Sequence, residues 1–221
     1  MVEPRGIFTR NRLKLLAMVT MLCDHVGVIL VRGELYLPLR LVGRIAFPIF
    51  AYFLVQGFLH TSDYRKYLLR IGIFALVSEV PFDIAFQGEL LEFQSQNVMF
   101  TLLIALVMHH FLQSWEYHST ARALVLLGGG FCGWLLRVDY GWFGVVVIGL
   151  FYLLRSVPKP YQFSLYALLF FSYGGIEGFG LLGVLCVLHY REDGEDIQLP
   201  RYLFYGFYPA HLLILWAVGR L

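Results

Sequence analysis

Long apolar segments dominate this chain of 221 residues and limit its fold more than any other feature does. A helix that crosses a bilayer needs roughly 20 mostly apolar residues. Only 14% of the residues are charged, whereas a soluble domain carries about 25%. The pattern predicts an all-α, polytopic membrane bundle that forms a single domain over residues 1–221. The nine candidate spans are 14–31, 38–58, 67–86, 98–113, 121–137, 140–154, 162–174, 178–190 and 202–219.

Basic residues in the short connections indicate how such a bundle is oriented, because Lys and Arg are enriched in cytoplasmic loops. If the N-terminus is cytoplasmic, twelve basic residues lie on that side: Arg5, Arg10, Arg12, Lys14, Arg65, Lys66, Arg70, Arg122, Arg155, Lys159, Arg191 and Arg201. The opposite side receives five: Arg32, Arg40, Arg44, Arg137 and Arg220. We therefore expect a multi-pass protein of the cell (inner) membrane with a cytoplasmic N-terminus.

Several functional classes are disfavoured by the sequence. The net charge of +2 and the lack of basic–aromatic clusters argue against a nucleic-acid partner. Three cysteines without paired spacing argue against a disulfide framework or a metal finger. No GxSxG, P-loop, GxGxxG or HExxH motif occurs. His109 falls near the predicted end of a span, where surface exposure is the expectation.

A lysine and a histidine on the first span suggest a ligand path. Lys14 and His25 are eleven residues apart, which is almost three helical turns, so both side chains share one face. The rise between them is about 16 Å, or roughly half the hydrocarbon thickness. Lys14 is then at the cytoplasmic mouth and His25 near the midplane. This arrangement suits a long ligand with an anionic head and a neutral tail.

Charged residues on the first two spans need partners, because an unpaired charge inside a membrane is costly. Asp24 precedes His25 and points about 100° away from it around the helix. Arg44 lies about two turns into the second span, and Asp24 is the first candidate to face it. Pro48 should bend or weaken this second helix. The alternatives are a purely structural polar pair, or an arginine that extends to the headgroups.

The last span carries a second histidine at a similar depth. Counted from Arg201, His211 lies about 15 Å along the helix, which matches the depth of His25. Tyr208 is one turn from His211, and Pro209 loosens the backbone between them. The matching depths favour a shared cavity over two unrelated core histidines.

Acidic and amide side chains of the middle spans are candidates for acceptor binding. Glu79 and Asp83 share a helix face, and they suit acid–base chemistry, helix capping or pairing with Arg137. Asn97 is placed to cap the fourth span. Asp139 is suited either to cap the sixth span or to bind an acceptor group at the outer surface. We keep Glu79, Asn97 and Asp139 as candidate substrate-binding residues.

Six motifs together resemble the TraX family, whose namesake is the pilin acetylation protein of conjugative plasmids. They are LKLLAMVTMLCDHVG, GRIAFPIFAYFLVQGFLHT, KYLLRIGIFALVSEVPFD, NVMFTLL, DYGWFGV and FYPAHLLIL. The family is similar to a wider group of membrane acyltransferases, including the acyltransferase-3 class. That group shares a basic residue, ten residues and a histidine on the first helix, which Lys14 and His25 match. The resemblance implies acetyl transfer from acetyl-CoA to an amine or hydroxyl.

The residues and the resemblance together predict a membrane-embedded acetyltransferase. Lys14, with Arg12 or Arg70, would bind the phosphates of acetyl-CoA at the cytoplasmic face. The thioester would reach His25, which would act as general base, since the ordinary pKa of an imidazole is about 6.5.

Further side chains would support this base. Asp24 would orient His25 or hold Arg44, and a donor such as Arg44, Tyr208 or His211 would stabilise the oxyanion. The expected partners are the lipid bilayer and an acceptor protein, peptide or small molecule.

Two other readings fit the same polar residues. A proton-coupled membrane transporter would also use an intramembrane Asp/His/Arg network, although no inverted repeat is evident. A metal site built on His25, His211 and Asp24 lacks a close-spaced ligand pair, so we predict no metal. The sequence leaves open the acceptor, N- or O-acylation, the oligomeric state, the side of acceptor entry and the existence of an acyl-enzyme.

Overall fold

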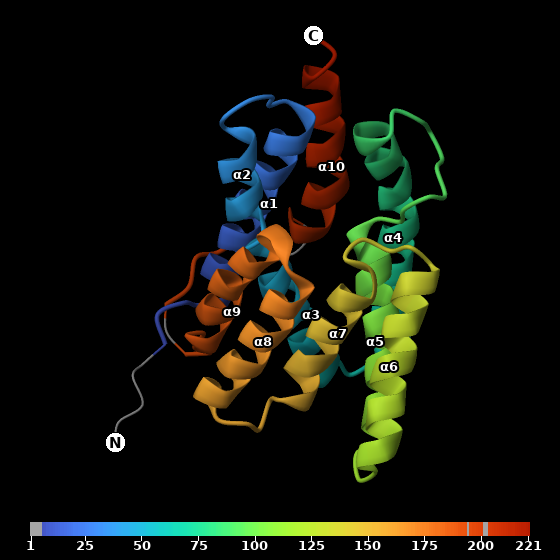
Figure 1. The fold of residues 1–221 in the computed structure, drawn as a ribbon, viewed down its shortest axis with the longest axis vertical. Helices are drawn as coiled ribbons and strands as arrows, with labels where there is room; N and C mark the ends of the chain where they lie inside the picture. The colour runs from blue at the N-terminus through green and yellow to red at the C-terminus, as the bar shows by residue number, and fades with distance from the viewer. Residues whose placement is uncertain (1–5, 194, 201–202) are drawn as a thin grey trace. The chain divides into compact units, whose positions relative to one another are not determined.

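A computed structural model describes residues 6–193, 195–200 and 203–221, and the described part folds into helices without a strand element. The prediction of an all-α fold is confirmed for these residues. Arg5, Arg201 and the first residue of the predicted span 202–219 lie outside them. In chain order the helices (Figure 1) are α1 Arg10–Ile29, α2 Tyr36–Gly43, α3 Ala46–His60, α4 Tyr64–Phe86, α5 Val98–Ser114, α6 Ser119–Leu135, α7 Gly141–Leu153, α8 Lys159–Tyr173, the 3₁₀ helix η1 Gly175–Phe179, α9 Gly180–Leu188 and α10 Leu203–Val218.

The predicted second span is divided between α2 and α3. The break falls at Arg44 and Ile45, four and three residues before Pro48. Proline has no N–H for the carbonyl four residues earlier, and its ring clashes with that carbonyl. A helix that ran without interruption past Arg44 would meet this clash, so the chain turns there and α3 begins with Pro48 in its first turn.

One stretch of the described residues is long and apolar enough to cross a membrane, as judged by length and composition. It is Tyr36–His60, which comprises α2 and α3 in 25 residues with a mean hydropathy of 1.6. Other apolar helices are shorter, at 10–17 residues. The longer helices α1 and α4 carry several charged residues, which lower their hydropathy. The nine-span topology therefore stays a prediction.

The first compact unit comprises Met1–Phe50 and Val157–Leu221. Helix α1 packs against α2 and α10, while α8 packs against α9, and η1 contacts α2, α8 and α9 (Figure 1). Backbone hydrogen bonds attach the segment after α9 to the start of the chain: Ile7 N donates to His189 O at 2.8 Å, and Arg191 N donates to Phe8 O at 2.9 Å. The N-terminal end of α1 is thereby held in place.

The second compact unit comprises Ala51–Ser156. Within it α5 packs against α4, α6 and α7, and α6 packs against α7. A Cβ on Gly133 of α6 would lie 2.7 Å from the carbonyl oxygen of Gly141 at the start of α7. Only glycine permits this approach, which lets α6 and α7 form a tight helical hairpin.

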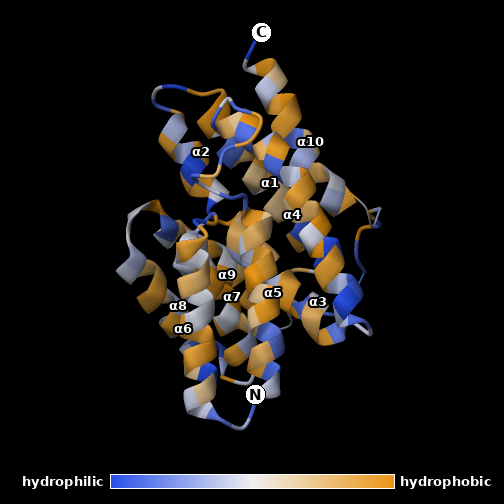
Figure 2. Ribbon diagram, turned by 90° about the vertical axis from the view of Figure 1, so that its right-hand side faces the viewer, coloured by the Kyte–Doolittle hydropathy of each residue, from blue (hydrophilic) through white to orange (hydrophobic). Residues whose placement is uncertain are grey.

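Many large apolar residues of the helices are exposed, and hydrophobic residues predominate along most of the helices (Figure 2). Water-soluble monomers seldom expose contiguous apolar patches larger than a few hundred Å². This surface is typical of a protein whose helices face lipid or a partner. The exposed residues include Leu69, Leu76, Leu127, Phe131, Leu168, Phe171 and Ile214.

Candidate functional site

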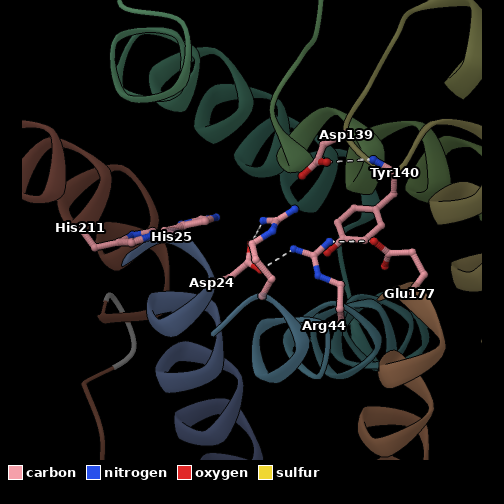
Figure 3. A network of polar contacts seen from close by, with 8 residues as sticks. Asp24, His25, Arg44, Asp139, Tyr140, Glu177 and His211 are labelled. Atoms are coloured by element: carbon pink, nitrogen blue, oxygen red, sulfur yellow. Dashed lines mark hydrogen bonds and ion pairs between the residues drawn. The ribbon is translucent and has the colours of Figure 1, made fainter. Parts of the chain in front are cut away.

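Four charged side chains of the first unit form a network of buried and half-buried ion pairs. Asp24 of α1 accepts a hydrogen bond from Nη2 of Arg44 on Oδ1 at 2.6 Å, and one from Nη1 of Arg40 on Oδ2 at 2.7 Å. Nη1 of Arg44 also donates to Oε1 of Glu177 in η1 at 2.9 Å (Figure 3). Two carboxylates thus face two guanidiniums, so the formal charge of the network is zero.

Local structure explains how Asp24 and Arg44 meet. Asp24 lies on the buried face of α1, and Arg44 follows directly after the last residue of α2. Between the two helices, a Cβ on Gly43 would overlap the Asp24 side chain. The absence of a side chain at Gly43 therefore lets the backbone of α2 approach Asp24 closely enough for both guanidiniums to reach it.

A pair of histidines lies beside the ion pairs. Nδ1 of His25 and Nε2 of His211 are 2.6 Å apart, and Nδ1 of His211 lies 2.7 Å from the carbonyl oxygen of Phe207. The ring planes of the two histidines differ by 7° and their centroids are 4.9 Å apart. Since the nitrogens are much closer than the centroids, the rings meet edge to edge in nearly one plane (Figure 3).

The predicted residue Tyr208 lies next to this pair. Its ring centroid is 5.8 Å from that of His211 and 6.4 Å from that of His25, and its side chain is buried. The structure therefore brings together the five residues predicted to surround the reacting centre, namely His25, Asp24, Arg44, Tyr208 and His211.

Lys14 lies on the same side of α1 as His25. Its Nζ atom is 4.6 Å from the centroid of Phe204, near the start of α10, just as His25 contacts His211 further along α10. The two helices run in the same direction, so the cation and the imidazole follow one stripe of α1 along α10. Arg12 is exposed on the first turn of α1.

The remaining predicted residues belong to the second unit. Glu79 is buried and accepts hydrogen bonds on Oε2 from the backbone N of Asn97, at 3.1 Å, and from its Nδ2. Asn97 caps α5 as predicted, since its Oδ1 accepts from Met99 N at 2.8 Å. Arg70 is exposed on α4, with its guanidinium carbon 5.1 Å from the centroid of Tyr67.

Asp139 does not occupy the capping position of α7. That position is held by Tyr140, whose φ of 61° is left-handed, and Asp139 accepts from Tyr140 N on Oδ1 at 3.0 Å. The carbonyl oxygen of Asp139 accepts a hydrogen bond from the hydroxyl of Thr101. The predicted ion pair of Glu79 or Asp83 with Arg137 does not form between these described residues. Asp83 instead accepts from Glu92 N at 2.9 Å.

Sequence reasoning missed three notable residues. Glu177 lies in a glycine-rich turn without a helical pattern. The sequence does place its charge within an apolar region, and such a charge indicates a paired or functional residue. Arg40 was assigned only to the outer side. His109 was expected at the surface but is fully buried, with Nε2 3.3 Å from the carbonyl oxygen of Ile148. It lies more than one turn before the C-terminal end of α5, which continues to Ser114.

Metal ligands do not gather at the site. Across the part of the chain that the structure describes, no three His, Cys, Asp or Glu side chains are placed to hold one metal ion. Both oxygens of Asp24 are instead occupied by arginines.

An apolar helical fold with a charge-balanced polar network inside it is typical of a membrane-associated protein. A family model described as TraX protein matches residues 9–219. The chain therefore belongs to the TraX family, as its motifs suggested, and membership supports association with a membrane.

Two relatives are informative. The probable fimbrial assembly protein FimC, serogroup H1, of Dichelobacter nodosus is 29% identical over an alignment 238 residues long. The alignment covers 94% of this chain and 94% of that protein. The uncharacterized protein RP591 of Rickettsia prowazekii (strain Madrid E) is 27% identical over 136 residues, which cover 60% of this chain and 50% of that protein. No solved structure matches the chain significantly.

Proposed function

We propose that this protein is a membrane-embedded acetyltransferase that moves an acetyl group from acetyl-CoA to an amine or hydroxyl, with His25 as general base. The observation that carries the proposal is the hydrogen bond between Nδ1 of His25 and Nε2 of His211 at 2.6 Å, on the stripe of α1 that also bears Lys14. An imidazole held by a second group is the usual arrangement of a positioned base.

The donor would enter from the end of α1 at which Lys14 and Arg12 lie. Their charges would bind the phosphates of acetyl-CoA. The rise of about 16 Å from Lys14 to His25 is a distance that an extended pantetheine arm would follow. The match of Lys14 and His25 to the first-helix pattern of membrane acyltransferases supports this direction.

The proposed transfer conserves atoms and charge. Nε2 of His25 takes the proton of the acceptor N–H or O–H while the acceptor atom attacks the thioester carbonyl carbon. A tetrahedral oxyanion forms and collapses, so that the new amide or ester bond remains and the C–S bond breaks. The CoA thiolate then receives the proton from His25. Acetyl-CoA and the acceptor thereby yield CoA with a free thiol and the acetylated acceptor.

The oxyanion would be stabilised by Tyr208 rather than by Arg44. Both Nη atoms of Arg44 donate to carboxylates, one to Asp24 and one to Glu177, so the guanidinium is committed to holding the ion-pair network. The Tyr208 hydroxyl is a neutral donor on the same helix as His211 and one turn away from it. In this proposal Asp24 holds Arg44 and Arg40, and it does not orient His25.

The acceptor is proposed to be the N-terminus of a protein or peptide. Because one relative is named a probable fimbrial assembly protein, a fimbrial subunit is the first acceptor to test. Glu79, Asn97 and Asp139 remain candidates for acceptor binding. We place the protein in the inner membrane with several spans and a cytoplasmic N-terminus, which would put acetyl-CoA and Lys14 on the same side.

The experiment uses protein purified in detergent with radiolabelled acetyl-CoA and a short peptide that has a free N-terminal amine. His25→Ala should abolish labelling of the peptide but leave thermal stabilisation by CoA nearly intact. The matched control is His118→Ala, because His118 is an exposed histidine at the start of α6. Full turnover in His25→Ala would contradict the base assignment.

CoA binding also separates the enzyme from a proton-coupled transporter. An acetyltransferase should gain thermal stability from CoA, whereas a transporter driven by the same polar residues should respond to a pH gradient across a vesicle membrane instead. A response to the gradient without any stabilisation by CoA would favour the transporter.

A further inference from the structure

The hydrogen bonds of the histidine pair run in one direction. The carbonyl oxygen of Phe207 only accepts, so Nδ1 of His211 must carry the proton that it shares with Phe207 at 2.7 Å. In a neutral imidazole the other nitrogen is then an acceptor. Nε2 of His211 therefore accepts, and the proton of the 2.6 Å contact belongs to Nδ1 of His25.

The surroundings favour a neutral pair. His211 is buried, and burial in surroundings of low dielectric disfavours the charged form of an imidazole. An imidazolium at His211 would reverse the hydrogen bond, but it would add an unpaired cation beside a network whose four charges already cancel, in a region of low dielectric. The neutral, directional arrangement avoids this cost.

We propose that His211 is a positioning residue that holds His25 as the Nδ1-protonated tautomer, so that Nε2 bears the electron pair that acts as the base. The proposal rests on the proposed acetyl transfer for the use of that electron pair. The fixed tautomer itself depends only on the two hydrogen bonds described above.

The same contact would support the second half of the reaction. When Nε2 of His25 takes the proton of the acceptor, the ring becomes an imidazolium whose Nδ1–H still donates to Nε2 of His211. A hydrogen bond from a charged donor is stronger than one from a neutral donor. His211 would thus stabilise the protonated base while keeping its ring directed at the reacting atoms, which is the task that a carboxylate performs in the serine protease triad.

The backbone sets the orientation of His211. Its ring lies parallel to that of Phe207, with an interplanar angle of 7° and centroids 4.6 Å apart. The hydrogen bond to the Phe207 carbonyl and this ring contact both come from the preceding turn of α10. The chain of hydrogen bonds from His25 through His211 therefore ends at the backbone oxygen of Phe207, and it needs no third titratable side chain.

The test has one arm that needs no substrate. Full-length protein with ¹⁵N-labelled histidine is examined in detergent by NMR, and the His25 signals are assigned by their loss in His25→Gln. In the wild type, Nδ1 of His25 should be protonated and Nε2 unprotonated. In His211→Leu the acceptor is gone, so the Nε2-protonated form should appear. In His211→Gln the Oε1 atom still accepts, and the wild-type tautomer should be largely retained.

The second arm measures acetyl transfer. His211→Leu should lower kcat by about 10²–10⁴-fold, the usual contribution of a positioned general base, with little change in the KM for acetyl-CoA. His211→Gln should recover part of that loss. A purely structural role would instead change stability and both kinetic constants without this rescue.

The outcomes separate the two proposals. Wild-type His25 protonated on Nε2, or a tautomer that is the same in His211→Leu, would overturn the positioning role even if acetyl transfer is observed. If His211→Leu does not fold, the wild-type and His211→Gln spectra still test the positioning role, because both should show His25 protonated on Nδ1. The expected tautomers in a protein that transfers no acetyl group would support the assignment of His211 and overturn the proposed function.

Discussion

Nη2 of Arg44 lies 2.6 Å from Oδ1 of Asp24, and each side chain is only 8% exposed. The same guanidinium reaches Glu177 at 2.9 Å. Removal of one partner from a buried ion pair leaves an uncompensated charge, which is far more destabilising than the loss of an exposed pair. Arg44 therefore bridges two carboxylates from different segments of the first unit, and Arg40 supplies the second positive charge that balances them.

Replacement of Arg44 should test this role directly. Arg44→Gln should lower the free energy of unfolding by about 3–5 kcal/mol, measured by reversible unfolding in detergent, because Asp24 and Glu177 would lose their shared partner. Lys66→Gln is the matched control, since Lys66 is 84% exposed in its ion pair with Asp63, and it should change stability little. Equal effects of the two substitutions would contradict the importance of the buried network.

The close approach of α1 and α2 gives a second prediction. A Cβ on Gly43 would overlap the side chain of Asp24, so Gly43→Ala should force the helices apart and cost about 1–3 kcal/mol of unfolding free energy, as overpacking does. Gly128 of α6 has nothing within 4 Å of the corresponding position. Gly128→Ala should therefore be stabilising by about 0.5–1 kcal/mol, and the two substitutions should differ in sign.

The helices were largely predictable from the sequence because apolar runs and their boundaries are local properties. Pro48 predicted a bend or weak point in the segment that divides into α2 and α3, and Asn97 predicted the cap of α5. Helix depth was also sufficient to place His25 opposite His211, because both counts rest on a rise of about 1.5 Å per residue.

Other features depend on contacts between distant segments and were not predictable. Glu177 reaches Arg44 only because η1 packs against α2, and nothing near Glu177 in the sequence indicates this. Arg40 and Arg44 are four residues apart and share one face of α2, and both reach Asp24 because α1 packs against α2. The direction of the His25–His211 hydrogen bond required the position of the Phe207 carbonyl oxygen.

Asp196 should make the end of α1 sensitive to acid. It accepts hydrogen bonds from Oγ1 of Thr9 at 2.6 Å and from the backbone N of Asn11 at 2.8 Å. Partial burial alone would raise the pKa of Asp196, but these hydrogen bonds and that from Ile197 N outweigh it and lower the pKa below 3.8. A depressed pKa in the folded state contributes stability above pH 3.8 that is lost as the pH falls through the folded value.

The measurement compares amide hydrogen exchange at Asn11 and Ile197 in wild type and Asp196→Asn. At pH 7 the wild type should be better protected, because an ionised carboxylate is the stronger acceptor. Once the pH falls below the folded pKa of Asp196, the difference should disappear. A difference that persists unchanged in strong acid would show that charge is not the cause.

Lys14 offers the last prediction, because it separates binding of the donor's phosphates from chemistry at the thioester. Lys14 is about 16 Å along α1 from His25, so it cannot touch the reacting atoms. Lys14→Gln should lower kcat/KM for acetyl-CoA about 10-fold or more, since a hydrogen bond to a charged group contributes about 1.5–3 kcal/mol and each 1.4 kcal/mol is tenfold. With S-acetylpantetheine, which lacks the nucleotide phosphates, wild type and Lys14→Gln should be equally active, and Lys66→Gln should match wild type with both donors. A similar loss with both donors would mean that Lys14 supports the fold of α1 against Phe204 and does not bind the nucleotide.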